Sequence, residues 1–231
     1  MCIRDSYYTA HVTNADFGFP QLKRNYYGLE MYLEHPFDGK WYGKVDYLYS
    51  KSYGNSEGQV RSDIGQDDVS ATVDWDFPAL MSYSNGELSN SRRHTLKAYG
   101  SYQLTEEFLL SGNLTIQSGA PKDCLGYFGA NETDPVNYGS YYHWCNGQPS
   151  PPGKQGHLPF TYLMDLSAEY RPIWADKKLA FTVSVFNVLN KREKLAIYPQ
   201  AGQTGAVDPD YKTTLFQTTP RYARFGISYD F

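Results

Sequence analysis

The end of the chain places the strongest constraint on its fold. From Phe225 to Phe231 every second residue is apolar, and the residues between them are small, polar or charged. This alternation predicts a β-strand with one apolar, largely aromatic face. The chain stops on an aromatic residue that is in phase with this face, instead of on a polar tail. We therefore expect the terminus itself to lie in a hydrophobic belt.

The same alternation recurs along the chain, and it predicts eight strands. In the second of them, Leu29, Met31 and Leu33 share one face, while Glu30 and Glu34 share the other. The predicted strands are residues 7–14, 24–35, 41–53, 92–104, 108–118, 158–171, 178–189 and 221–231.

The connections between these strands alternate between short and long. Short turns are predicted at 36–40, 105–107 and 172–177, and long polar loops at 54–91, 119–157 and 190–219. Transmembrane β-barrels have short periplasmic turns and long external loops, and their strands are about 9–11 residues long. Loops of this length would be unusual in a compact soluble domain. The sequence therefore predicts an all-β, antiparallel transmembrane barrel, here a partial barrel of about eight strands.

Composition agrees with this prediction and excludes other classes. The chain has 22 Tyr and 12 Phe at a mean hydropathy of −0.58, which fits aromatic girdles around a polar lumen. A net charge of −4, a pI near 5.7 and the lack of a basic run argue against a nucleic-acid partner. No nucleophile-elbow, zinc-protease, dinucleotide or P-loop motif occurs, so we predict neither enzymatic activity nor a cofactor.

The pattern at the end of the last strand resembles a known assembly signal. Its positions are a polar residue, a glycine and two aromatics, namely Arg224, Gly226, Tyr229 and Phe231. This pattern is similar to the C-terminal signal of bacterial outer-membrane barrels. The resemblance implies that outer-membrane lipid and the barrel-assembly machinery are partners. We expect the glycine to allow a close backbone approach that a side chain would obstruct.

Three further runs resemble the TonB-dependent outer-membrane receptors. They are Phe-Asn-Val-Leu-Asn at 186–190, Pro-Arg-Tyr-Ala-Arg-Phe-Gly at 220–226, and Gly-Glu-Leu-Ser-Asn-Ser-Arg-Arg-His-Thr-Leu-Lys at 86–97. The last run, with the Tyr-Gly-Ser-Tyr that follows at 99–102, is similar to the Oar-like subset of these receptors. The resemblance implies energy-coupled uptake of a scarce small ligand, with TonB as partner through an N-terminal plug.

The resemblance also implies that residues 7–231 are the C-terminal part of a larger plugged barrel of about 22 strands. Residues 1–6 have neither a basic region nor an apolar stretch of a secretory signal, and they look like a translated sequencing adaptor. We exclude them from the fold. Two other readings stay open: a complete eight-stranded structural or adhesive barrel, and a soluble carbohydrate-binding β-sandwich.

The second long loop contains two cysteines, Cys124 and Cys145. In an oxidising compartment such a pair predicts a disulfide. The alternatives are two free thiols, or metal ligation together with His143. We predict no metal site, because a second ligand pair at zinc spacing is missing.

Other polar and aromatic groups are candidates for ligand contact. The loop aromatics could stack on a ligand or pack one loop on another; they are Tyr127, Phe128, Tyr138, Tyr141, Tyr142 and Trp144. Four loop carboxylates could bind calcium, but we predict that they are solvated; they are Asp74, Asp76, Asp208 and Asp210. Charged groups on the lumen face could line a transport path, but we predict structural pairing; they are Glu30, Lys44, Asp46, Lys97, Asp165, Glu169 and Arg224.

Overall fold

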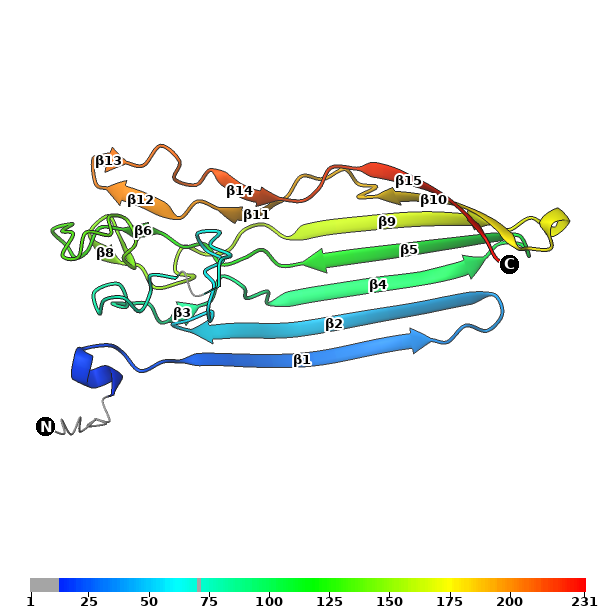
Figure 1. The fold of residues 1–231 in the computed structure, drawn as a ribbon. Coiled ribbons are helices and arrows are strands. Elements are labelled where there is room, and N and C mark those ends of the chain that lie inside the picture. The colour runs from blue at the N-terminus through cyan, green and yellow to red at the C-terminus, as the bar shows by residue number, and fades with distance from the viewer. Residues whose placement is uncertain (1–12, 70–71) are drawn as a thin grey trace, which may run out of the picture.

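The computed structural model describes residues 13–69 and 72–231, and all of its long strands belong to one sheet (Figure 1). Seven long strands lie close to seven of the predicted segments, which confirms those predictions. They are β1 (Arg24–His35), β2 (Trp41–Gly54), β4 (His94–Gln103), β5 (Phe108–Gln117), β9 (Thr161–Tyr170), β10 (Leu179–Phe186) and β15 (Tyr222–Tyr229).

The prediction of a first strand at residues 7–14 is contradicted at its end. Residues 7–12 lie outside the described part of the chain, and Asn14 begins a short 3-10 helix, η1 (Asn14–Phe17), instead of ending a strand. Thr13 caps this helix, because its backbone N–H and its hydroxyl both donate to the Asp16 carboxylate, at 2.7 and 2.8 Å. Among the described residues the first edge strand is therefore β1.

The sheet is an antiparallel meander in the order β1-β2-β4-β5-β9-β10-β15, and a two-residue strand β3 (Gly86–Glu87) also pairs with β2. No pairing joins β1 to β15 in the part of the chain that the structure describes, so the sheet is open there. The three short turns lie at one end of the sheet with the C-terminus, and the long loops gather at the other end (Figure 1).

The strand register keeps one apolar face continuous across the sheet. Leu33 pairs with Val45, Val45 with Ala98, Ala98 with Leu114, and Leu114 with Met164. Apolar side chains on this face are exposed, as for Leu33 at 77%. An exposed apolar face of this kind is the lipid-facing side of a membrane β-sheet.

Aromatic residues gather on this face near the short turns. Trp41 at the start of β2 pairs with Tyr102 on β4. The rings of Phe108 and Tyr170 stack at 4.5 Å, and the rings of Tyr170 and Phe181 lie 6.4 Å apart. This row corresponds to an aromatic girdle at one membrane interface.

The opposite face of the sheet is polar, and its charges pair locally. The Lys44 ammonium lies 3.4 Å from Asp46 and 3.9 Å from Glu34, and the Arg171 guanidinium lies 2.6 Å from Glu169. These contacts support the prediction that such groups pair along the wall.

The terminal strand β15 pairs with β10 along its whole length and forms the second edge of the sheet. Its apolar side chains are exposed, Phe225 at 77% and Ile227 at 73%. On the side of β10, the structure shows no close approach at Gly226. A Cβ atom there would lie 3.8 Å from the Cβ of Thr182, which is an ordinary van der Waals distance.

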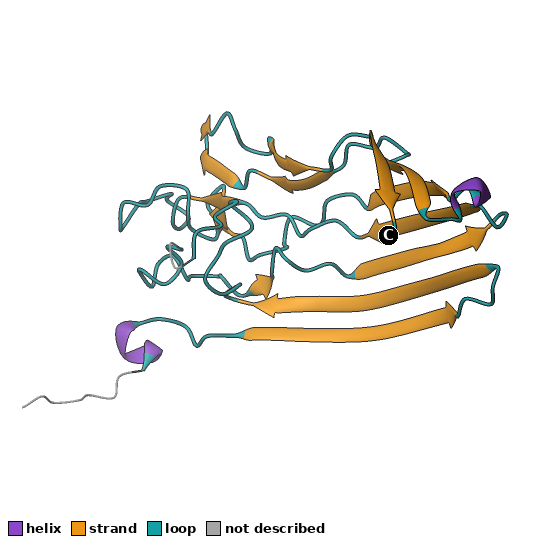
Figure 2. Cartoon of the chain, turned by 45° about the vertical axis from the view of Figure 1, so that its right-hand side comes forward, coloured by secondary structure: helices purple, strands orange, loops and turns teal. Residues whose placement is uncertain are grey.

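The described parts of the three long loops contain short strands of their own (Figure 2). They run from 55 to 93, from 118 to 160 and from 187 to 221, and we call them together the loop cap. Their short strands, besides β3, are β6 (Leu125–Gly126), β7 (Trp144–Cys145), β8 (Gln148–Pro149), β11 (Lys194–Ile197), β12 (Gln200–Gln203), β13 (Ala206–Val207) and β14 (Thr214–Gln217). A second 3-10 helix, η2 (Ile173–Ala175), lies in the last short turn.

The buried apolar core lies in the loop cap and not on the long strands. Leu80, Leu125 and Tyr142 are almost completely buried, and Ala180 is the one buried apolar residue among the described long strands. No second large sheet packs on the main sheet within the described residues, which is evidence against the soluble sandwich. None of the described helices has the length and apolar character needed to cross a membrane.

Candidate functional site

Buried polar contacts join the first long loop to the second. The backbone N–H of Glu87 donates to the carbonyl of Pro152 at 3.0 Å. The Asp123 carboxylate accepts hydrogen bonds from the Ser89 hydroxyl at 3.1 Å and from the backbone N–H of Gly153 at 2.7 Å. Because Asp123 is buried, these bonds fix the relative position of the two loops.

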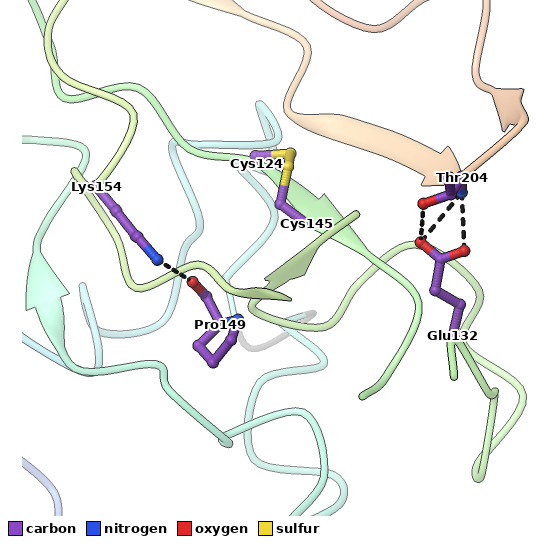
Figure 3. Close-up of a disulfide and its surroundings, with 6 residues drawn as sticks. All are labelled: Cys124, Glu132, Cys145, Pro149, Lys154 and Thr204. Carbon is purple, nitrogen blue, oxygen red and sulfur yellow. Dashed lines mark hydrogen bonds between the residues drawn. A yellow bond between two sulfur atoms is a disulfide. The ribbon is translucent and has the colours of Figure 1, made fainter. Parts of the chain in front are cut away.

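The second and third long loops are joined by a short parallel pairing between β6 and β12. Beside it, the Glu132 carboxylate accepts hydrogen bonds from the backbone N–H of Thr204 at 2.9 Å and from its hydroxyl at 2.7 Å (Figure 3). The three loops therefore form one connected layer over the end of the sheet.

Cys124 and Cys145 form a disulfide inside the second loop, with their Cα atoms 5.6 Å apart (Figure 3). This geometry leaves neither free thiols nor a metal site at the two cysteines. His143 lies nearby and is buried, and burial, with a contribution from the Arg61 charge, lowers its pKa to about 3. Among the described residues no group of three or more His, Cys, Asp or Glu side chains could hold a metal ion.

A buried arginine organises the centre of the loop cap. Arg61 is 4% exposed, and its guanidinium donates two hydrogen bonds to Asp63, at 2.6 and 3.0 Å, and one to Asp74 at 2.6 Å. Burial alone would raise the pKa of Asp63, but the Arg61 charge outweighs burial and lowers it. The bidentate contact satisfies both carboxylate oxygens of Asp63, and together with the bond to Asp74 it uses three of the five N–H donors of Arg61.

Asp123 lies close to Arg61 and Asp63, but its pKa is shifted in the opposite direction to that of Asp63. Burial raises the pKa of Asp123 to about 7, and the negative charge of Asp63 contributes in the same direction. The side chain is thus partly protonated at neutral pH and acts mainly as a hydrogen-bond partner between the loops.

Glu87 is a second buried anchor. Its carboxylate pairs with the Arg93 guanidinium, accepts a hydrogen bond from the Ser91 hydroxyl at 3.0 Å, and lies 3.3 Å from His157 Nε2. Burial would raise the pKa of Glu87, but the contacts with Arg93, His157 and Ser91 outweigh it and lower the pKa to about 2.

All three loops contribute to one cavity of about 650 Å³ at the mouth of the sheet. Gln117, the last residue of β5, lies on its sheet side. The lining residues are Val60, Ser62, Asp63, Gly65, Gln66, Asp67, Ser89, Asn90, Arg92, Gln117, Ala120, Pro121, Lys122, Asp123, Leu158, Leu195, Ala196, Ile197, Pro199 and Phe216. A cavity of this size with mostly apolar walls and a few polar groups is typical of a small-molecule site.

The six aromatics predicted from the sequence lie elsewhere in the loop cap. Tyr142 is completely buried and donates to Asp134 at 2.6 Å, so the prediction that Tyr142 contacts ligand is wrong. Phe128 packs edge-on against Tyr142 at 5.6 Å and against Trp144 at 5.7 Å, and Tyr138 lies 6.5 Å from Tyr141. This packing favours the alternative in which the aromatics hold the loops together.

The predicted solvation of the loop carboxylates is also wrong for one residue. Asp74 is largely buried against Arg61, because the guanidinium compensates a charge that would otherwise stay in water. Asp76 accepts a hydrogen bond from the Tyr138 hydroxyl at 2.7 Å, and Asp208 accepts one from the backbone N–H of Asp210 at 2.8 Å.

No sequence pattern singled out Arg61, Asp63 and Asp123, or the cavity residues Arg92 and Lys122. Arg61 and Asp63 are two positions apart in a polar loop, and this spacing only weakly predicts a bidentate ion pair. Arg92 belongs to the run at 86–97, but neither that run nor the sequence around Lys122 indicates a shared cavity, since the relationship of these two residues depends on how separate loops pack.

Comparison with known proteins agrees with the architecture. Over 92% of its length the chain is 30% identical to the TonB-dependent transporter Oar of Myxococcus xanthus, and it spans 23% of the length of that relative. The outer-membrane transporter YddB of Escherichia coli has a similar fold, with a TM-score of 0.54, 11% identity, and coverage of 91% of this chain and 26% of that one.

A second solved structure is the closed form of the ferric-catecholate import receptor Fiu of Escherichia coli K12. It gives a TM-score of 0.51 at 13% identity, and the match covers 90% of this chain and 21% of that one. No family model matches the chain. We assign the chain to the outer-membrane β-barrel region of the TonB-dependent receptors. The long loops of the receptor barrel are therefore extracellular, and its short turns are periplasmic.

Two of the runs that resemble these receptors have structural roles in the barrel. In the run at 86–97, Glu87 is the anchor between the first and second loops. In the run at 186–190, Asn187 has a positive φ of 48°, and its side-chain amide donates to the carbonyls of Lys191 and Thr219 at 2.9 and 2.7 Å. Asn187 thus closes the base of the third loop.

The disulfide generates a first prediction. Replacing Cys124 and Cys145 by serine should destabilise the second loop by about 3 kcal/mol, because the unfolded loop gains entropy. Hydrogen exchange should become faster in residues 118–160 and stay unchanged in β4 and β5. Wild type treated with reductant is the control. Recovery of both residues as free thiols from cell envelopes, in a non-reducing peptide map, would contradict the structure.

Glu87 generates a pH-dependent prediction. Its folded pKa of about 2 lies below the ordinary value of 4.5, so its contribution is complete above about pH 4.5 and is lost as the pH falls through about 2. At pH 7 the Glu87→Gln variant should weaken the loop cap by on the order of 2 kcal/mol, allowing for solvent screening.

The difference between this variant and wild type should shrink as the pH is lowered from 4.5 to 2, measured by hydrogen exchange of residues 86–93 and 150–158. Glu106→Gln, in an exposed short turn, is the matched control and should change neither loop. A difference that is constant with pH would show that the charge of Glu87 does not stabilise the loops.

Proposed function

We propose that this barrel belongs to an outer-membrane receptor that takes up a scarce small ligand in a TonB-dependent manner. The observation that carries this proposal is the convergence of all three extracellular loops on one cavity above the polar face of the barrel wall. The similarity to a TonB-dependent transporter supports the energy source. The sequence has no recognisable catalytic motif, and we therefore propose transport and not catalysis.

In this proposal the loop cap selects the ligand and the wall forms one side of the path. The second loop is cross-linked by its disulfide and joined to the first loop by the buried Asp123. Tyr141 lies with Tyr198 and Gln200 at a smaller pocket, and it stays a predicted ligand contact. The open sheet does not favour a complete eight-stranded adhesive barrel.

The decisive test is uptake by the intact receptor in matched strains with and without TonB. We expect accumulation of its ligand only where TonB and the proton gradient are both present, because no other energy source drives uptake against a concentration gradient across the outer membrane. A porin substrate measured in the same strains controls for general permeability. Equal accumulation in the two strains would indicate a passive pore or a surface protein.

We also propose that the terminal strand directs assembly of the barrel through the barrel-assembly machinery. Phe231 is fully exposed at the end of the lipid-facing row, and its ring lies 5.4 Å from that of Tyr229. Both rings are therefore available to another protein.

Deleting Phe231 should lower the amount of receptor in the outer membrane several-fold without changing the ligand preference of the receptor that inserts. Phe231→Tyr keeps an aromatic terminus and should assemble normally. Quantitative immunoblots of outer-membrane fractions measure both. An undiminished level after the deletion would show that the terminal aromatic does not act as an assembly signal.

A further inference from the structure

The cavity of the loop cap is walled mainly by apolar side chains. The third loop contributes Leu195, Ile197 and Phe216, and the other two loops contribute Val60 and Leu158 on the remaining sides. Phe216 is 52% exposed although it is aromatic, and its ring is positioned near Gly65, whose φ of +71° is unfavourable for other residues. The walls therefore favour a ligand with an apolar body.

Two of the three carboxylates that line the cavity already accept hydrogen bonds. Both oxygens of Asp63 accept hydrogen bonds from Arg61. The two oxygens of Asp123 accept from Ser89 and from the Gly153 backbone. A third carboxylate, Asp67, is an exposed residue. The buried carboxylates thus have little remaining capacity to bind a cation.

The donor groups of the cavity are less fully occupied. The half-buried Lys122 has no partner for its ammonium among the described residues, although its backbone N–H is fixed to the Gly156 carbonyl at 2.8 Å. Arg92 donates through Nη1 to the carbonyls of Ser89 and Ser91, at 2.9 and 2.8 Å. Its other nitrogens have no hydrogen bond, and its charge has no ion pair, within the part of the chain that the structure describes.

A partly buried cation without a carboxylate partner costs free energy unless a ligand compensates it. We propose that the cavity binds an organic acid with an apolar body, whose carboxylate is held by Lys122 and Arg92 while the body packs against Phe216 and Ile197. This inference rests on the proposed function, because it names the ligand class of the same cavity.

The cavity offers few partners for a highly charged ligand. Two cations are available, and most of the remaining wall is apolar, so a ligand with more than two negative charges would bury charge without partners. An arginine can bind both oxygens of a carboxylate, and the lysine adds a point charge that tolerates several ligand positions. The volume of about 650 Å³ leaves space for a ring system or a medium-length chain beside the carboxylate.

The test uses three probes that share one ring system and differ in charge. They are 2-naphthoate, the neutral 2-naphthamide, and the cationic 2-naphthylmethylammonium. Binding to the intact receptor in nanodiscs is measured by calorimetry at two salt concentrations. We expect naphthoate to bind about tenfold more tightly than the amide, the cation to bind most weakly, and the preference for naphthoate to decrease at high salt.

Substitutions then test which residues cause the preference for the negatively charged probe. Lys122→Gln and Arg92→Gln should each weaken naphthoate binding five- to tenfold and leave amide binding unchanged, whereas Lys122→Arg should retain the preference. Phe216→Ala should weaken both probes equally. The matched control is Lys154→Gln, because Lys154 lies in the same loop but donates to the Pro149 carbonyl at 2.6 Å and does not line the cavity (Figure 3).

Several outcomes would overturn the inference. They are equal binding of naphthoate and amide, preference for the cation, no binding of any probe, or naphthoate binding that is unaffected by both charge variants. The wild-type probe series does not depend on whether a variant folds. Binding of the probes does not require TonB. Naphthoate binding without TonB-dependent uptake would therefore refute the proposed function but would still support the proposed ligand class.

Discussion

The structure depends on the requirement that every backbone N–H and C=O group of a membrane strand finds a partner within the sheet. Water is absent from the bilayer core, so an unpaired group there costs several kcal/mol. The pairings of β4 with β5 and of β5 with β9 accordingly run without a register shift. A slip of one residue would turn every lipid-facing side chain toward the lumen. The unbroken register therefore fixes both the faces of the wall and the level at which each loop begins.

A wall of this kind has no interior of its own, and the loop cap supplies the buried core instead. The long strands expose apolar residues to lipid on one face and polar residues to the lumen on the other. In the cap, Leu80, Leu125 and Cys124 are buried, and the Arg61 group is buried with them. Wall and cap are therefore stabilised by different physical terms: backbone pairing and lipid contact in one, and apolar burial, ion pairs and a disulfide in the other.

This division explains how much the sequence could predict. Alternation with a period of two is local, so seven strands, their faces and the segregation of short and long connections followed from it. The disulfide followed from a pair of cysteines in one loop. The end of the first predicted strand was wrong because 13–18 has its own local capping, in which Thr13 bonds Asp16. At Gly226 the pattern could not indicate packing, since the neighbouring strand β10 leaves space for a side chain.

The cap could not be predicted in the same way, because its contacts join residues far apart in sequence. Asp123 meets Ser89, Glu132 meets Thr204, and Gly65 meets Phe216, and none of these pairs has a periodic or spacing signal. The loop aromatics show the difficulty most clearly. Exposed aromatics and aromatics that pack between loops have the same composition, and only the fold distinguishes the buried Tyr142 from a ligand contact.

The anchoring of the three loops is unequal, and this bears on the cavity. The first and second loops are joined through the buried groups Glu87 and Asp123, and the second is closed by its disulfide. The third loop is attached at its base by Asn187, but its outer part is held to the second by a short strand pairing and by the exposed Glu132–Thr204 contact. Gln200 and Ala201 at that pairing are buried, whereas the Glu132–Thr204 contact lies at the solvent surface, where hydrogen bonds are individually weak. The apolar wall from the third loop thus depends on one short buried pairing and on surface contacts, while the cations that face it lie on two loops joined by buried side-chain anchors.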